Sequence, residues 1–516
     1  MGDTNKSDDK ASPAEPAFSE REMVKALSQG RGASHFGAAR DERDGSSPLQ
    51  DDMRCPLARR ADQGGTVDAS SPLTVVRGDF FTPRQKGTAS PAPGGKAAAG
   101  TACAPPIMTK NSARRHFEMK FSKKVQRCEQ SPVRKFYPYE KAALDRGVHV
   151  RHLNIGQPDI PTPQPFFDAI RNFGKNVVEY APAPGTEIFV EAVQGYYARL
   201  GCPIEKEDIL TTFGGSEALE FVMECIADEG DEILSPEPFY PNYTSFVNIT
   251  GAKIVPIPTT AEEGYRYASR EKIEPLITER TRAILITNPG NPTGVVLTPE
   301  ESRLLADIAR EHNLFLVSDE VYREIVYAGK ISTMLQYEDA AENVVVIDSV
   351  SKRFSSCGAR VGMMVTRNRE LIGQALKLCQ GRLCAATLEQ TGAAAMYNTL
   401  DESYYKSILE EYTRRRDAIV TALEKLPGVS FTQPEGAFYF MVTLPVDDTE
   451  KLQYFLLEEF THNNETVMFA PGAGFYSDPA MGRNKARVAY VTAPEDLTRA
   501  VELLGLGIQA YNERKG

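Results

Sequence analysis

The sequence predicts an α/β protein whose large domain has a mostly parallel central sheet flanked by helices, followed by a smaller α+β domain. Short apolar runs that are typical of buried strands occur at 283–287 (AILIT), 314–318 (LFLVS) and 344–348 (VVVID). Amphipathic stretches with helical spacing separate these runs, and this alternation is the pattern of βαβ units around a parallel sheet. Beyond about residue 400 the alternation stops, which indicates a different architecture there.

One connecting helix is marked by its first residues. Thr298 supplies an N-cap, Pro299 suits the first turn, and Glu301 completes a capping box. The apolar face that follows consists of Leu304, Leu305 and Ile308. The sequence therefore predicts a helix that begins after Thr298 and packs on the sheet.

The last part of the chain has another order of elements. A long charged helix is expected over 404–425, strands are expected around FYFMV (438–442) and RVAYV (487–491), and a last helix begins at Pro494. This order predicts the smaller α+β domain.

These patterns divide the chain into four segments. Residues 1–117 are rich in Ala, Gly, Pro, Ser and mixed charge, and such a segment cannot bury enough surface to offset its conformational entropy. We expect a disordered N-terminal extension there; a regulatory tail, or a start codon placed too early, is the alternative. Residues 118–160 are predicted to form an N-terminal arm and part of the small domain, 161–400 the large domain, and 401–516 the small C-terminal domain.

Composition limits the possible partners. The 516 residues include 70 acidic and 59 basic side chains, which gives a formal net charge of -11. This charge argues against a surface that binds nucleic acid phosphates or anionic lipid. No window approaches the roughly 20 uncharged apolar residues that a membrane-spanning helix requires. We therefore expect small-molecule substrates and neither a nucleic acid nor a membrane partner.

The cysteines and the N-terminus bear on location. The eight cysteines form no CxxC pair, and no Cys or His cluster has zinc-like spacing, so neither a disulfide scaffold nor a metal site is predicted. The polar start MGDTNKSDDK resembles neither a secretory signal nor an organelle transit peptide. The expected location is the cytoplasm.

Two segments carry residues suited to a carbonyl and a phosphate. In DSVSKRFSSCGAR (348–360) a strand ends in a hydroxyl-rich turn with Lys352, and a partly desolvated lysine there can form a Schiff base. In TTFGGSEALEFVMECIADEG (211–230) glycines precede an amphipathic helix that closes at Gly230. Backbone N–H groups at such a start can face a phosphate, although the same glycines can also serve only a tight turn.

Two further segments follow predicted strands. NPGNPTG (288–294) is a rigid polar turn after AILIT, and Asp319 closes the strand LFLVS. Taken singly, these are an Asn-Pro turn and an N-cap. The carboxyl ends of neighbouring parallel strands, however, meet at one sheet edge. Together the four segments offer a lysine for an aldehyde, donors for a phosphate, an acid for a pyridinium nitrogen and an asparagine for a phenolic oxygen. Those are the groups of pyridoxal 5'-phosphate.

With these motifs in this order, residues 118–516 resemble the fold type I pyridoxal-phosphate aminotransferases of class I/II, and in particular their prokaryotic-type aspartate aminotransferase branch. Two departures stand out. Gly214 occupies a place where some relatives carry a hydroxyl, and Cys357 lies in the loop after the lysine, where we interpret it as a small packing residue.

The resemblance implies roles around the cofactor ring. Lys352 of SVSK would be the Schiff-base lysine and the catalytic residue, and Asp319 of SDEVY would pair with the pyridinium nitrogen. Tyr322 and Asn291 of NPTG would hydrogen-bond the phenolic oxygen, and Tyr240 would stack on the ring.

The resemblance also implies residues for the cofactor phosphate and a homodimer. The phosphate would be held by Gly215, Ser216, Ser349 and Arg360. Tyr180, in EYAPAPGTE, is similar to the tyrosine that reaches the neighbouring subunit's cofactor phosphate, so the active unit would be a homodimer.

For the substrate, the family pattern points to Gly156, Asn291 and Arg487. Arg487 would clamp the α-carboxylate, a task that suits a planar guanidinium; a surface arginine paired with an acid is the alternative. A second arginine for a side-chain carboxylate is not evident. Arg382 is one candidate, but it is better interpreted as a surface or structural residue.

The implied reaction moves an amino group from an L-amino acid, best matched by aspartate, to 2-oxoglutarate by a ping-pong mechanism in which Lys352 acts as general base and acid. Alternatives are an aminotransferase for alanine, aromatic or other amino acids, or a lyase on the same fold. A non-catalytic regulator that senses the cofactor would need a DNA-binding module, and residues 1–115 lack its helical periodicity and basic face.

Overall fold

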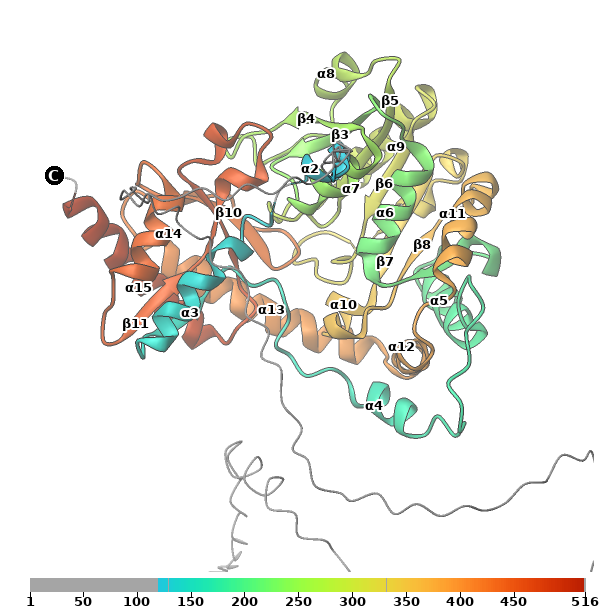
Figure 1. Cartoon of the computed structure of the whole chain (residues 1–516), viewed down its shortest axis with the longest axis horizontal. Coiled ribbons are helices and arrows are strands. Elements are labelled where there is room, and N and C mark those ends of the chain that lie inside the picture. Colours follow the sequence, from blue (N-terminus) through green and yellow to red (C-terminus); the bar gives the residue numbers. More distant parts are fainter. Residues whose placement is uncertain (1–118, 129, 331, 515–516) are drawn as a thin grey trace, which may run out of the picture. The chain divides into compact units, whose positions relative to one another are not determined.

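The structure is a computed structural model that describes residues 119–128, 130–330 and 332–514 (Figure 1). The predicted disordered extension, 1–117, lies outside the described residues. The described chain contains a seven-stranded sheet with the strand order β2-β8-β7-β6-β5-β3-β4, in which only β8 runs antiparallel to its neighbours. Its strands are β2 (Ile209–Thr212), β3 (Glu232–Glu237), β4 (Lys253–Pro258), β5 (Thr281–Thr287), β6 (Phe315–Asp319), β7 (Val344–Ser349) and β8 (Gly362–Val365). The predicted mostly parallel central sheet is confirmed.

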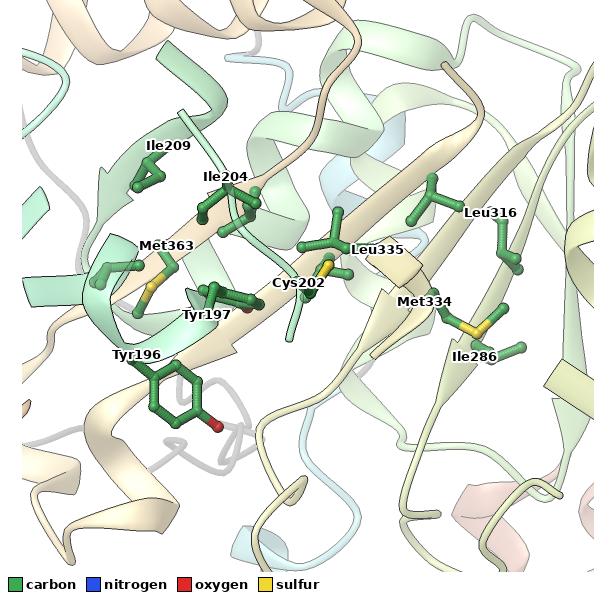
Figure 2. Close-up of a cluster of buried hydrophobic side chains, with 14 of the residues drawn as sticks. Tyr196, Tyr197, Cys202, Ile204, Ile209, Ile286, Leu316, Met334, Leu335 and Met363 are labelled. Carbon is green, nitrogen blue, oxygen red and sulfur yellow. The ribbon is translucent and has the colours of Figure 1, made fainter. Parts of the chain in front are cut away.

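Helices cover both faces of this sheet. Successive side chains of a strand point to opposite faces, and the buried strands of this sheet carry apolar side chains on both of them. Ile284 and Ile286 of β5 belong to the core under α5, α9 and α12, whereas Ala283 and Leu285 belong to the core under α6, α7 and α11. In Figure 2 Ile286 and Leu316 lie around Met334 within the first of these cores. The helices that accompany this sheet are α4 (Gln164–Arg171), α5 (Glu187–Arg199), α6 (Gly214–Ile226), α7 (Asn242–Thr250), α8 (Arg270–Ile273), α9 (Pro299–Glu311), α10 (Val350–Arg353), α11 (Arg369–Arg382) and α12 (Thr387–Thr399).

A four-stranded sheet and a two-stranded sheet complete the described chain, with the orders β12-β13-β10-β9 and β1-β11. A separate apolar core packs the larger of these sheets against helices that Figure 1 draws in orange and red. The strands are β1 (His149–His152), β9 (Ser430–Phe431), β10 (Tyr439–Thr443), β11 (Glu465–Met468), β12 (Ala470–Pro471) and β13 (Lys485–Ala489). The helices are α2 (Lys123–Gln126), α3 (Tyr137–Asp145), α13 (Glu402–Leu423), α14 (Thr449–Glu458) and α15 (Pro494–Glu513).

Short 3-10 turns join these elements. They are η1 (Arg134–Phe136), η2 (Lys206–Asp208), η3 (Glu274–Leu276), η4 (Met334–Gln336), η5 (Glu338–Ala340), η6 (Cys357–Ala359), η7 (Gly472–Phe475) and η8 (Pro479–Gly482). The domain boundaries stay a prediction.

Individual elements agree with the sequence patterns, with shifts at their ends. The capping box of α9 is present in both directions, with Glu301 N donating to Thr298 Oγ1. The helix that was expected to close at Gly230 ends at Ile226 instead, because the Asp231 carboxylate accepts a hydrogen bond from the Asp228 main-chain N–H and turns the chain toward β3. The strand expected over 487–491 ends at Ala489.

The described part of the chain offers neither a membrane-spanning helix nor a cluster of metal ligands. No helix there is long and apolar enough to cross a bilayer. Among the same residues, no group of three or more His, Cys, Asp or Glu side chains is arranged to hold a metal ion.

Candidate active site

A cavity of about 840 Å³ opens where β5, β6 and β7 end. Its wall also includes residues of α6, β10 and β13, of the segment between β3 and α7, and of the segments before and after β1. All but one of the predicted site residues line it, namely Gly156, Gly215, Ser216, Tyr240, Asn291, Asp319, Tyr322, Ser349, Lys352, Arg360 and Arg487. The exception is Tyr180, which is 80% exposed and does not line this cavity.

Lys352 is carried by α10, which begins directly after β7. Ser349 caps this short helix, since its Oγ accepts from the Ser351 N–H at 3.1 Å. The half-buried Lys352 donates from Nζ to the main-chain oxygen of Gly156 at 2.7 Å, and Cys357 Sγ lies 3.6 Å from the same nitrogen. The amine therefore points into the cavity between two chain segments that are far apart in sequence.

Asp319, the last residue of β6, is a buried carboxyl group. Tyr243 donates its hydroxyl proton to Asp319 Oδ2 at 2.8 Å. Burial raises the pKa of Asp319 to about 6, and the hydrogen bond from Tyr243 opposes that rise. A carboxylate that burial makes costly to ionise is well suited to a cationic ring nitrogen, which would compensate its charge.

Arg487, Asn291 and Tyr322 form a connected polar group. Arg487 Nη1 donates to Asn291 Oδ1 at 3.2 Å, and Asn291 Nδ2 donates to the Tyr322 hydroxyl at 3.3 Å. Arg487 is 5% exposed, and its Nη2 donates to the main-chain oxygen of Asn154 at 2.9 Å. Its guanidinium lies over the ring of Tyr439, 4.4 Å from the ring centre.

The donors of Arg487 are not all used. Its Nε is buried without a hydrogen-bond partner, and no carboxylate of the described residues forms an ion pair with it. Because burying an uncompensated charge is costly, this guanidinium is suited to an anionic ligand.

The start of α6 and Arg360 lie together. Gly214 has φ +76, and a Cβ there would lie 2.5 Å from Arg360 Nη2, so glycine permits both the turn and the close approach. Arg360 donates to the main-chain oxygens of Phe213 and Cys357, at 3.0 and 2.9 Å. Ser216, in the first turn of α6, is exposed. This is a set of donors for an anion.

The residues present fit pyridoxal 5'-phosphate. The amine of Lys352 suits its aldehyde, the buried Asp319 suits its ring nitrogen, and the donors around Gly214 and Arg360 suit its phosphate. Tyr240 also lines the cavity, and its hydroxyl accepts from Asn242 Nδ2 at 2.8 Å.

A buried ion cluster adjoins the site. Arg323 donates to Glu320 Oε2 at 2.6 Å and to Asp348 Oδ2 at 2.8 Å, and Arg353 donates to both oxygens of Asp348 at 3.1 Å. Burial alone would raise the pKa of Asp348, but the Arg353 and Arg323 guanidinium groups hold it below its usual value. Glu320, Asp348 and Arg353 each directly neighbour a cavity-lining residue in sequence, so the cluster fixes the segments that carry the site.

Sequence reasoning missed several residues of the cavity. Ser351 and Cys357 lie inside a motif that was recognised, Asn154 lies two residues before Gly156, and Tyr439 lies in the strand predicted around 438–442. Arg134 comes from a segment without a local signal. Arg382 does not line the cavity; it forms an ion pair with Glu217 at 2.9 Å and donates to main-chain oxygens, which is a structural role.

Comparisons with known proteins indicate the family of this chain. Residues 148–504 match the family model described as aminotransferase class I and II. The aspartate aminotransferase of Bacillus subtilis (strain 168) is 30% identical over 406 residues, which are 76% of this chain and 100% of that protein. An aspartate aminotransferase of Pyrococcus horikoshii is 31% identical over 68% of this chain and 88% of its own length.

Solved structures share the fold. A single mutant of Thermus thermophilus aspartate aminotransferase has a TM-score of 0.70 and 27% identity, and the match covers 76% of this chain and 100% of that chain. The Thermotoga maritima aspartate aminotransferase has a TM-score of 0.69 over 75% of this chain and 100% of its own. The protein therefore belongs to the aminotransferase class I and II family, with the fold of the fold type I enzymes and a dependence on pyridoxal phosphate.

Proposed function

We propose that this transaminase moves the amino group of L-aspartate to 2-oxoglutarate. The observation that carries the proposal is the meeting, in one cavity, of the Lys352 amine, the buried Asp319 carboxyl and the buried Arg487 guanidinium without a carboxylate partner. The choice of aspartate is supported by the relatives from Bacillus subtilis and Pyrococcus horikoshii, which are named aspartate aminotransferases.

Arg487 binds the α-carboxylate of the substrate in this proposal. Two of its nitrogens are already fixed by Asn291 and Asn154, so the guanidinium plane is held in place. A guanidinium has five N–H donors, and those that remain, including the unpartnered Nε, can serve a carboxylate. The α-carbon of the substrate is thereby oriented.

Pyridoxal phosphate, when bound, supplies an aldehyde that condenses with amino groups and a ring that accepts electrons. Lys352 removes the proton from the substrate Cα, and the Gly156 carbonyl orients Nζ until that step. Asp319 holds a proton on the ring nitrogen. Asn291 and Tyr322, already hydrogen-bonded to each other, bind the phenolic oxygen, and Tyr240 covers the ring.

The remaining assignments concern the phosphate and the substrate. Gly215, Ser216, Ser349 and Arg360 bind the phosphate, and all four line the cavity. Gly156 lines the cavity beside the substrate position, and its lack of a side chain permits the close approach of Tyr439.

An absorbance spectrum of the purified holoprotein tests this proposal. Addition of L-aspartate without any 2-oxo acid should shift the cofactor band and release about one equivalent of oxaloacetate per site, because a ping-pong enzyme completes its first half-reaction alone. The Lys352→Ala variant should show neither change. Its control, Lys377→Ala on the exposed face of α11, should show both changes as the wild type does. A cofactor band that responds to other amino acids but not to aspartate would contradict the substrate assignment.

We also propose that the active unit is a homodimer in which Tyr180 reaches the partner's cofactor phosphate. Tyr180 is 80% exposed, and large apolar side chains are exposed in the segments around it. Arg382 connects these segments, because it donates to Ala183 O and lies 5.3 Å from the ring centre of Phe213. The exposed apolar side chains are Val177, Val178, Ile188, Phe213 and Leu383. A second copy of this chain is the occupant that we expect on this surface; a monomer by light scattering would contradict it.

A cytoplasmic location is part of the proposal. Its support is that the six cysteines of the described residues carry free thiols, which is typical of a reducing compartment. Cell fractionation with an antibody to the native protein tests it, and recovery in an organelle fraction would contradict it.

A further inference from the structure

Arg134 lines the same cavity as Arg487, Lys352 and Arg360. It is the first residue of η1, in the arm that precedes α3, and its side chain is exposed. These four are the cations among the residues that line the cavity. In the proposed function Lys352, Arg360 and Arg487 have tasks, so Arg134 is the cation that the reaction has not yet used.

Packing on both sides holds the main chain of Arg134 in place. Phe136 is fully buried and contacts Tyr454, with ring centres 5.0 Å apart. Pro132 is packed against Gly474, where a Cβ would lie 2.4 Å from the proline Cβ. The main chain of the arm is therefore anchored on the small sheets and helices, whereas Arg134 is exposed and lines the cavity.

No described carboxylate forms an ion pair with Arg134. Glu140 of α3 also lines the cavity, and its Oε1 lies 3.6 Å from His152 Nε2. Arg134 and Arg487 thus present two guanidinium groups without carboxylate partners to one cavity. Both of them lower the pKa of the Tyr240 hydroxyl, which burial raises to about 12, so both cations act on the same part of the cavity.

We propose that Arg134 binds the distal carboxylate of a dicarboxylic substrate and thereby selects dicarboxylic over monocarboxylic amino acids and 2-oxo acids. The inference rests on the proposed function, in which Arg487 binds the α-carboxylate. A guanidinium suits this task because it binds a carboxylate through two parallel hydrogen bonds.

The exposure of Arg134 fits a transaminase that uses two diacids. Aspartate and 2-oxoglutarate differ by one carbon in the distance between their carboxylates, so a rigid cation would favour one of them. A long side chain on an anchored turn can adjust its reach to both lengths. The buried Arg487, in contrast, binds the group that the two substrates share.

Substrate half-reactions of the holoenzyme test the inference. The variants are Arg134→Gln, Arg134→Lys and, as a control of the same type in the same arm, Arg127→Gln, whose side chain pairs with Glu229 outside the cavity. Loss of a bidentate contact should lower kcat/KM for L-aspartate about 100-fold in Arg134→Gln, mainly through KM, and leave L-alanine within about threefold. Arg134→Lys should recover part of the loss, and Arg127→Gln should behave as wild type.

Binding of non-reacting acids gives a second readout that does not need turnover. Succinate and butyrate have four carbons each and differ in the second carboxylate. Calorimetry should show that Arg134→Gln weakens succinate about 100-fold and leaves butyrate unchanged.

The outcomes separate this inference from the proposed function. Two results overturn the role of Arg134 and leave the proposed function intact. In both of them the wild type turns over aspartate, and Arg134→Gln loses activity either equally toward aspartate and alanine or toward neither. A wild-type holoenzyme that converts alanine but neither aspartate nor glutamate overturns both.

Discussion

Lys352 donates a hydrogen bond from Nζ to the main-chain oxygen of Gly156 at 2.7 Å, across a sequence separation of 196 residues. The contact joins the lysine turn after β7 to the segment between β1 and α4. The position of the amine in the cavity therefore depends on a segment that contributes no strand to the seven-stranded sheet.

Gly156→Ala should damage activity through this contact. A Cβ at Gly156 would lie 1.8 Å from the Tyr439 hydroxyl oxygen, so either Tyr439 or the segment that holds Lys352 must move. We expect kcat/KM to fall about 100-fold, since small displacements of reacting groups have effects of this size. Gly373→Ala on α11 is the control: its Cβ meets nothing within 4 Å, so activity should be unchanged. Equal activities of the two variants would contradict the role of the contact.

The pKa of Asp319 predicts a pH dependence of stability in the cofactor-free protein. The folded state keeps the Asp319 proton up to about pH 6, whereas the unfolded chain releases it near 3.8. Between these values the folded state binds more protons, so the free energy of unfolding falls as the pH rises, by about 3 kcal/mol in total at most.

Urea unfolding at pH 4 to 8 measures this effect. The Asp319→Asn variant should lack this part of the slope, and added pyridoxal phosphate should reduce it in the wild type because a cation then faces the carboxylate. Identical slopes in the wild type and the variant would show that Asp319 titrates normally.

The ion cluster around Arg323 should contribute strongly to stability. Arg323→Met leaves the buried Glu320 and part of the charge of Asp348 uncompensated, and we expect a loss of about 3–5 kcal/mol in the free energy of unfolding. Arg310→Met is the control, because its exposed pairs with Asp307 and Asp339 should contribute less than about 1 kcal/mol. Chemical denaturation of both holoproteins provides the comparison; similar losses would refute a special contribution of the buried cluster.

Mixing two inactive variants tests the shared dimer site. If Tyr180 serves the partner's site, a hybrid of Lys352→Ala and Tyr180→Ala subunits contains one complete wild-type site. After subunit exchange at equal amounts, activity should recover to about a quarter of the wild-type value, since half of the dimers are hybrids with one working site. Without recovery in demonstrably hybrid dimers, Tyr180 would have to act within its own subunit.

The sequence could predict those parts of the fold and the site whose signals are local. The strand runs that became β5, β6 and β7 are apolar on both faces, and Thr298 and Glu301 mark α9 by their own hydrogen bonds. Because Asp319 and Lys352 follow such strands directly, the geometry of a parallel sheet was enough to bring them to one edge.

Other residues of the site could not be predicted, because their places depend on packing between distant segments. Arg134 reaches the cavity only because Phe136 is buried beside Tyr454, and Tyr439 does so only because β10 pairs with β13. Arg134 lies in no motif with its own signal, and the pattern that predicts the strand at 438–442 does not show which side chain of that strand reaches the cavity. The role of Tyr180 stays a prediction, since it concerns a contact between two copies of the chain.

Borohydride reduction of the holoprotein, followed by peptide mass spectrometry, tests whether Lys352 holds the cofactor. Reduction fixes pyridoxal phosphate to the lysine that holds it. We expect the phosphopyridoxyl group on Lys352 and not on the exposed Lys377, and we expect none on Lys352→Ala. Stoichiometric labelling of another lysine, with Lys352 unmodified, would contradict it.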